Sequence, residues 1–135
     1  MYKHVLVPVA LEHGSGFSKA FALAKLIADP DAKISAVSVV EPIPGFARQY
    51  LPEGELDKRL DEALAKLKKI VPDDMNVETK IVVGHPGRRI VDYAETIEAD
   101  CIVISSHRPG MQDYFLGSTA GRVVRHSPCA VHVMR

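Results

Sequence analysis

Two patterns of hydrophobic residues alternate along the chain. Short runs rich in β-branched residues predict strands, whereas longer stretches with apolar residues three and four positions apart predict helices. The predicted strands are residues 3–9, 34–40, 77–83, 101–105 and 129–134. The predicted helices lie between them, at residues 17–27, 56–71, 86–97 and 117–126. Strands and helices therefore follow one another in strict alternation.

This alternation predicts the fold class. It is typical of a parallel sheet whose strands are joined by crossover helices. The run Val5-Leu6-Val7 is continuously apolar, as expected for a strand covered on both faces. Right-handed crossovers and a change of winding direction place the first and fourth strands side by side. We expect a single α/β domain, residues 1–135, with an open parallel five-stranded sheet, helices on both faces and strand order 3-2-1-4-5.

The same topology predicts where a ligand binds. In open parallel sheets the ligand crevice lies outside the carboxyl ends of the strands, at the point where the winding direction changes. Here that point is between the first and fourth strands. The long connection that follows the second strand contains Pro42, Pro44 and Pro52, so we expect it to be irregular. Its length suggests that residues 41–55 fold over the crevice as a lid.

Charge and length exclude several classes of protein. The chain has 17 lysines and arginines against 17 aspartates and glutamates, so it lacks the positive field of a nucleic-acid-binding protein. No apolar run approaches the length of a membrane span, and the start of the chain has no secretory pattern. We therefore expect a cytoplasmic protein without nucleic-acid or membrane partners. Cys101 and Cys129 adjoin strand-like runs, which favours buried thiols in a reducing compartment.

The segment between the fourth strand and the fourth helix carries the candidate chemistry. Residues 105–119 concentrate small, hydroxyl and basic side chains. A phosphate group needs hydrogen-bond donors and compensating positive charge. Backbone amides at the helix start, the hydroxyls of Ser118 and Thr119, and the side chains of His107 and Arg108 would supply both. Gly117 lets the backbone come close to a ligand.

These motifs resemble those of a known family. Ser106-His107-Arg108-Pro109 followed by Phe115-Leu116-Gly117-Ser118 is similar to the nucleotide loop of the universal stress proteins, in the form of their bacterial F/G-type subgroup. The segments 83–86 and 123–131 also resemble that family, so the likeness covers nearly the whole chain. The resemblance implies a Rossmann-like fold of the adenine nucleotide alpha hydrolase type. It further implies a role as a stress-response or regulatory module.

The resemblance also implies a set of residues that hold an adenine nucleotide, whether ATP, ADP or AMP. One group would flank the adenine and ribose at the strand ends: Pro8, Val9, Ala10, Val39, Ile104 and Ser105. A second group would hold ribose or phosphate oxygens: Ser106, His107, Arg108, Gly117, Ser118 and Thr119. No catalytic residue and no metal ligand is predicted among them.

The chain departs from the general family pattern at two places. Typical nucleotide-binding members have an aspartate two residues after the first-strand proline, where this chain has Ala10. The resemblance therefore supports a nucleotide more strongly than a bound Mg²⁺ ion. The first two glycines of the general motif are replaced by Ser105 and Arg108, which agrees with the F/G-type variant.

The last strand suggests a partner. If residues 129–135 form the sheet edge, their hydrogen-bonding groups stay open unless another chain pairs with them. The family's dimers resemble this arrangement, so we expect a homodimer. Two alternatives to nucleotide regulation remain. One is a slow ATP hydrolase or autophosphorylating protein with Ser106, Ser118 or Thr119 as acceptor and His107 as base. The other is a dimeric interaction protein with no nucleotide.

Overall fold

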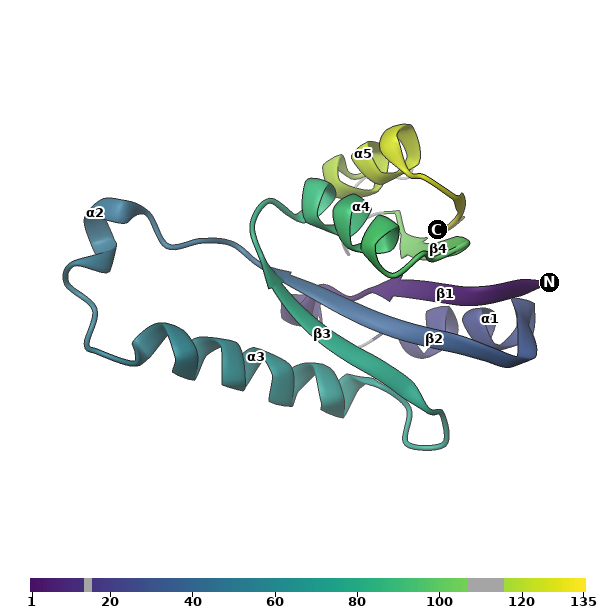
Figure 1. Cartoon of the computed structure of the whole chain (residues 1–135), viewed down its shortest axis with the longest axis horizontal. Helices are drawn as coiled ribbons and strands as arrows, with labels where there is room; N and C mark the ends of the chain where they lie inside the picture. Colours follow the sequence, from purple (N-terminus) through teal and green to yellow (C-terminus); the bar gives the residue numbers. More distant parts are fainter. Residues whose placement is uncertain (14–15, 107–115) are drawn as a thin grey trace.

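Five parallel strands form one sheet in the order β3-β2-β1-β4-β5 (Figure 1). The structure is a computed structural model, and it describes residues 1–13, 16–106 and 116–135. The strands are β1 (Tyr2–Pro8), β2 (Ala28–Val40), β3 (Val77–Val83), β4 (Cys101–Ser105) and β5 (Ala130–Met134). The predicted strand order is confirmed, and β1 pairs with both β2 and β4.

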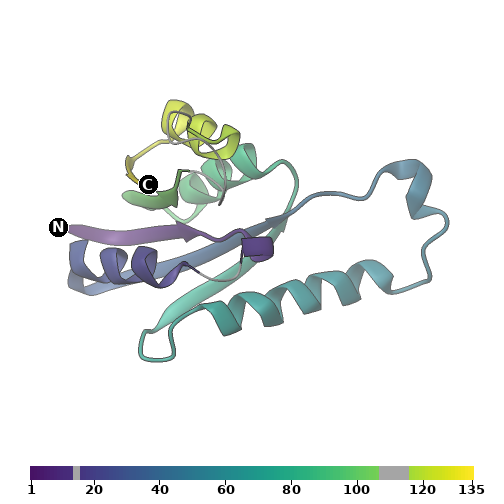
Figure 2. The same ribbon diagram turned by 180° about the vertical axis from the view of Figure 1, so that it is seen from behind.

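Helices cover both faces of this sheet, as predicted. On one side lie α1 (Ser18–Ile27) and α3 (Glu55–Ile70), and on the other lie α4 (Pro86–Thr96) and α5 (Ser118–His126) (Figures 1 and 2). Successive residues of a strand point to opposite faces, so each central strand contributes to two cores. Val5 and Val7 pack with Phe21 of α1, whereas Leu6 packs with Ile90 of α4.

The start of β2 differs from the prediction. The sequence Asp29-Pro30-Asp31 predicts a turn before a strand at Ile34, yet the backbone is extended from Ala28. Pairing with β1 nevertheless jumps from Ala28, opposite Tyr2, to Lys33, opposite His4. Residues 29–32 therefore have no partner on β1, which is the kind of irregularity that a proline within a sheet requires. Regular pairing begins one residue before the predicted strand.

The connection after β2 is also more ordered than predicted. It contains one turn of helix, α2 (Gly45–Arg48), in which the carbonyl of Pro44 accepts hydrogen bonds from the amides of Ala47 and Arg48 at 2.9 and 3.2 Å. Proline restricts the backbone conformation of the residue before it more than that of the residues after it. Its own fixed φ is compatible with the start of a helix. The loop after β1 likewise contains a short 3-10 helix, η1 (Leu11–His13).

The segment from Glu41 to Gly54 projects beyond the end of the sheet as an arm (Figures 1 and 2). Phe46 and Tyr50 on this arm are 76% and 80% exposed. In this arrangement the arm extends away from the sheet, and the predicted lid role stays a prediction.

A polar cluster joins β1, β2 and β4 at their amino ends. The carboxylate of Asp100 accepts hydrogen bonds from the amides of Lys3 and His4, both at 2.9 Å. The ring of His4 contacts the carbonyl of Ile97 at 3.1 Å and the Ser35 hydroxyl at 2.7 Å. Burial raises the pKa of Asp100, but hydrogen bonds from the amides of Lys3, His4 and Asp100 itself, with the nearby His4, together hold this pKa below its ordinary value. The cluster lies at the amino ends of the strands, away from the carboxyl ends where the ligand crevice is predicted.

Candidate functional site

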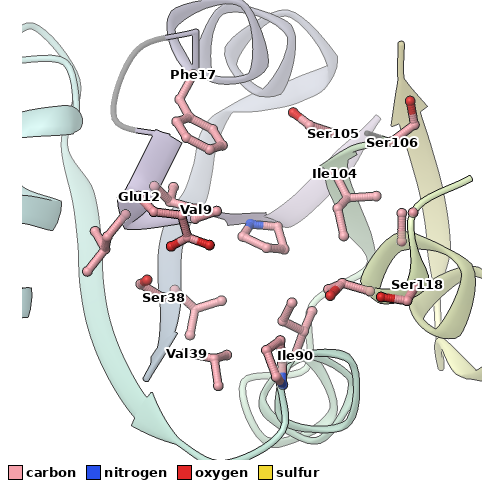
Figure 3. A pocket seen from close by; sticks show the side chains of 18 of the residues that line it. Val9, Glu12, Phe17, Ser38, Val39, Ile90, Ile104, Ser105, Ser106 and Ser118 are labelled. Carbon is pink, nitrogen blue, oxygen red and sulfur yellow. The ribbon is translucent and has the colours of Figure 1, made fainter. Parts of the chain in front are cut away.

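A cavity of about 930 Å³ lies at the carboxyl ends of β1, β2 and β4 (Figure 3). This is the crevice predicted from the reversal of strand order. Its volume is within the range of small-molecule binding sites. The cavity is bounded by the ends of the three strands, the start of α1, the start of α4 and the start of α5.

One part of the wall is apolar. Val9, Val39 and Ile104 stand at the ends of their strands, and Ile90 faces them from α4 (Figure 3). Phe17 closes the side next to α1 and is only 8% exposed. These side chains offer flat, nonpolar surfaces of the kind that cover an aromatic base.

Another part of the wall is the junction between β4 and α5. The Gly117 amide donates to the carbonyl of Ser106 at 2.7 Å, and the Ser106 amide donates to the carbonyl of Met134 at 2.8 Å. A Cβ atom on Gly117 would lie 2.9 Å from the Ser106 carbonyl oxygen, a separation too short for real contacts. Glycine is therefore required here by lack of space, since the φ of −57° suits any residue. This contact brings the helix start against the strand end.

The start of α5 offers hydrogen-bond donors to the cavity. Gly117 is the N-cap, and the first hydrogen bond of the helix runs from the Gly121 amide to the Gly117 carbonyl at 2.7 Å. The amides of Ser118, Thr119 and Ala120 therefore have no acceptor within the helix. All three residues line the cavity. Such a helix start favours an anion through its amides and its positive dipole end.

Negative charge lies on the opposite side. Among the described residues that line the cavity, only Glu12 and Glu41 are acidic. The Glu12 carboxylate faces the interior next to Val9, across from Ser118 (Figure 3). The cavity thus attracts an anion at its α5 end and accepts hydrogen bonds at its Glu12 end.

Ten of the twelve residues predicted to bind nucleotide line this one cavity. They are Pro8, Val9, Ala10, Val39, Ile104, Ser105, Ser106, Gly117, Ser118 and Thr119. The other two, His107 and Arg108, lie outside the described residues. Ser106 is buried, at 2% exposed, whereas Ser105 and Ser118 are exposed. The contact of each residue with a ligand stays a prediction.

Sequence reasoning missed several residues of the wall. Glu12, Phe17, Ser38, Glu41 and Ile90 are the clearest cases. Phe17 and Ile90 have helical apolar spacing, which indicates packing and does not distinguish a cavity wall from a core. Glu12 follows the first strand by four residues, and its position after a strand end was the one signal available.

Neither a cluster of metal-ligating side chains nor a membrane-spanning helix is present in the described residues. Across 1–13, 16–106 and 116–135, no group of three or more His, Cys, Asp or Glu side chains is arranged to hold a metal ion. Ala10 has no ligand atom in its side chain, and the carboxylates among the described residues that line the cavity are Glu12 and Glu41. Within the same part of the chain, each helix is too short or too polar to cross a membrane.

Known structures of other proteins share this fold. The structure of hypothetical protein MJ0577 superposes with a TM-score of 0.79, at 26% sequence identity, over 99% of this chain and 96% of that one. A structure described as a universal stress protein in complex with cAMP has a TM-score of 0.63, at 22% identity, over 99% of this chain and 97% of that one. The second likeness shows the fold alone.

The sequence comparisons identify the family. Universal stress protein G of Salmonella typhimurium is 30% identical over 145 residues, covering 100% of both chains. The sequence profile of the universal stress protein family matches residues 1–135 of this chain. The protein therefore belongs to the universal stress protein family.

Proposed function

We propose that this protein binds an adenine nucleotide in the cavity at the carboxyl ends of β1, β2 and β4. The observation that carries the proposal is the start of α5, where three amides without helical acceptors face a cavity with apolar walls. A nucleotide combines an anionic group with a flat aromatic base, and the cavity has one surface suited to each. The cAMP complex of a protein with the same fold supports this class of ligand.

The distribution of charge sets the orientation of the nucleotide. The phosphate would lie at Ser118 and Thr119, because the helix start stabilises negative charge. A phosphate beside Glu12 would be repelled, so that end of the cavity suits the nucleoside. There the carboxylate would accept hydrogen bonds from ribose hydroxyls or from the exocyclic amine of the base. The base would pack between Val9, Val39 and Ile90.

Nucleotide binding would regulate the contacts of this protein with its partners. A ligand that binds only the folded state stabilises it and shifts the population of loop conformations. Ser105, Ser106 and Gly117 line the cavity at the junction of β4 and α5, so a nucleotide there would change the surface that this junction offers to a partner. We propose a cytoplasmic role in stress-response regulation from membership of the universal stress protein family.

A homodimer through β5 is the second part of the proposal. In the described sheet β5 pairs with β4 on one side and with no strand on the other. An edge strand with an open row of backbone groups is a ready site for pairing with another chain. A second copy that pairs through the same strand would close both edges by two-fold symmetry.

Calorimetric titration tests the nucleotide proposal. AMP, ADP and ATP are each titrated into the wild type and the Glu12→Gln variant, with and without Mg²⁺. We expect binding of all three nucleotides to the wild type, and a rise of about 2.7 kcal/mol in unfolding free energy at a nucleotide concentration 100 times the Kd. Glu12→Gln should weaken AMP binding about tenfold, because the amide accepts fewer hydrogen bonds than the carboxylate. Absence of heat and of stabilisation with every nucleotide would favour the nucleotide-free interaction protein.

A further inference from the structure

The outer face of α5 carries a groove whose charged side chains are all basic. α5 lies at the surface of the molecule beside α4 (Figures 1 and 2), and the groove along it has a volume of about 510 Å³. Its wall includes His85, Arg122, Arg125 and His126. None of the described residues that line it is acidic. The whole chain has 17 lysines and arginines and 17 aspartates and glutamates, so this concentration of one sign is a local feature.

The basic side chains of this groove are separate from the nucleotide cavity. Arg122, Arg125 and His126 belong to the later turns of α5 and do not line that cavity. All three are exposed. A molecule in the groove can therefore contact them without entering the nucleotide cavity.

The two arginines have no carboxylate partner in the described part of the chain. Ion pairs there engage Arg59 with Glu55 and Arg89 with Asp92, and neither Arg122 nor Arg125 is paired in this way. Arg122 and Arg125 are three positions apart on α5, so they are neighbours on one face, with Cβ atoms roughly 5–6 Å apart. Two carboxylates at a similar spacing on another molecule would match this pair.

The stem of Arg122 is held in a defined position. A Cβ atom on Gly87 would lie 2.8 Å from Cδ and 3.0 Å from Cβ of Arg122. The arginine stem therefore lies directly against the backbone of α4, above a buried glycine. A side chain held along its stem loses less freedom when it binds than one on an open surface. Its guanidinium group presents paired N–H donors that match the two oxygens of a carboxylate.

The groove also has an apolar centre. A Cβ atom on Gly121 would have one neighbour within 4 Å among the described residues, Cδ2 of Leu116 at 3.8 Å. The helix is therefore open at Gly121, between Leu116 and Val124, which are 43% and 45% exposed. An apolar side chain from another protein would cover both of them there. An apolar centre with a polar rim, rich in arginine, is the usual anatomy of an interface between proteins.

We propose that this groove docks an acidic segment of a partner protein. An apolar side chain of the segment lies at Gly121, and its carboxylates pair with Arg122 and Arg125. The charge of the groove selects the sign of the partner, and it also steers and speeds the encounter. The apolar centre favours a protein over a nucleic acid, because nucleic acids are held mainly through their phosphates. The inference goes beyond the proposed function, since it needs neither a bound nucleotide nor a homodimer.

Fluorescence anisotropy with a synthetic peptide tests this proposal. The probe is a labelled peptide in which glutamates flank two central leucines, and it is titrated without nucleotide into the wild type, Arg122→Gln and Arg125→Gln. Arg59→Gln is the matched control, because it removes the same charge from an exposed position on α3. We expect the wild type to bind the peptide and each groove variant to lose about tenfold in affinity. Arg59→Gln should match the wild type, and added salt should weaken binding.

Two altered peptides test the two parts of the groove. Replacement of the glutamates by glutamine tests the arginines, and replacement of the leucines by serine tests the apolar centre. Both changes should weaken binding to the wild type. No binding of the original peptide, equal binding of either altered peptide, or unchanged affinity in both groove variants would overturn the proposal.

The remaining occupants are separate outcomes of the same experiment. A labelled single-stranded RNA that binds more tightly than the peptide, and loses affinity in Arg122→Gln and Arg125→Gln, would make the groove a nucleic-acid site instead. Sedimentation of the same variants without peptide tests a second copy of this chain. An oligomeric state that changes in Arg125→Gln and not in Arg59→Gln would assign the groove to contact between copies and overturn the docking of an acidic partner.

Discussion

Position 117 has room for a hydrogen atom and not for a methyl group. We predict that Gly117→Ala lowers the unfolding free energy by about 1–3 kcal/mol, because the new Cβ would press on the Ser106 carbonyl. Gly121→Ala is the matched control one turn later, where the nearest atom would be 3.8 Å away. It should be neutral or stabilise by up to about 1 kcal/mol, since alanine favours a helix. Urea unfolding measures both, and equal effects of the two substitutions would contradict the steric account.

Asp100 links β1 to β4 through a pH-dependent contact. Its pKa is lower in the folded state than in the unfolded chain, so its contribution to stability is present above the ordinary aspartate pKa of about 4. That contribution is lost as pH falls through the lower, folded value. We predict that Asp100→Asn costs about 1 kcal/mol at pH 7, because the amide accepts at one atom where the carboxylate accepts at two.

The pH profile distinguishes this contact from a general loss of packing. Stability of the wild type and of Asp100→Asn is measured by urea unfolding from pH 7 to pH 3. The gap between the two proteins should be constant at neutral pH and narrow below about pH 4, where Asp100 becomes protonated. A gap of constant size down to pH 3 would show that the charge of Asp100 has no part in it.

The sequence predicted the part of the site at the start of α5 better than the part formed by Glu12 and Phe17. Gly117, Ser118 and Thr119 belong to a continuous motif that can be read along the chain. Glu12 on η1 and Phe17 before α1 belong to no such motif, yet the fold brings both to the cavity beside the ends of the strands. Side chains brought together by packing of distant segments leave little local signal in a single sequence.

At the scale of elements, burial along α3 predicts which leucines stabilise the fold. Leu67 is fully buried against the sheet, whereas Leu56, near the start of the same helix, is 46% exposed. We predict that Leu67→Ala lowers the unfolding free energy by about 2–5 kcal/mol, the range for a buried leucine. Leu56→Ala should change it by less than about 0.5 kcal/mol. Comparable losses in thermal and urea unfolding would mean that the first turns of α3 are covered in solution.

Element boundaries were predicted well where the core specifies them. β3 and β4 have the predicted bounds; β4 is a buried apolar run, and β3 begins and ends with valine around an alternating stretch. β2 and the connection after it were predicted less well, since prolines at Pro30 and Pro44 indicate interruption and do not specify its form. Around Pro30 the chain stays extended without a partner on β1. After Pro44 it forms a turn of helix. Both choices depend on neighbouring segments.

At the scale of the whole molecule, the open edge of β5 predicts the effect of proline. The carbonyl of Met134 accepts a hydrogen bond from the Ser106 amide at the end of β4, so Met134 and His132 direct their backbone groups toward β4. Val133 lies between them and directs its N–H to the open edge. We predict that Val133→Pro gives a folded monomer, because edge positions tolerate proline. His132→Pro should instead lower the melting temperature, because it removes a hydrogen bond within the sheet.

Sedimentation equilibrium and circular dichroism check this pair of variants. The wild type should sediment as a dimer, and Val133→Pro as a monomer with a spectrum like that of the wild type. A Val133→Pro protein that remains dimeric would place the interface away from β5. A monomeric wild type would remove the homodimer from the proposed function.

The sequence by itself determined the alternation of strands and helices, the order of the strands and the motif at the start of α5. These follow from local periodicity, from the handedness of crossovers and from residues adjacent in the chain. Only the tertiary structure decided that Glu12 faces the start of α5 across one cavity, and that Arg122 lies on Gly87 beside a basic groove. The physical reason is that these residues come from separate segments, and their distances exist only after the two faces of the sheet have been packed.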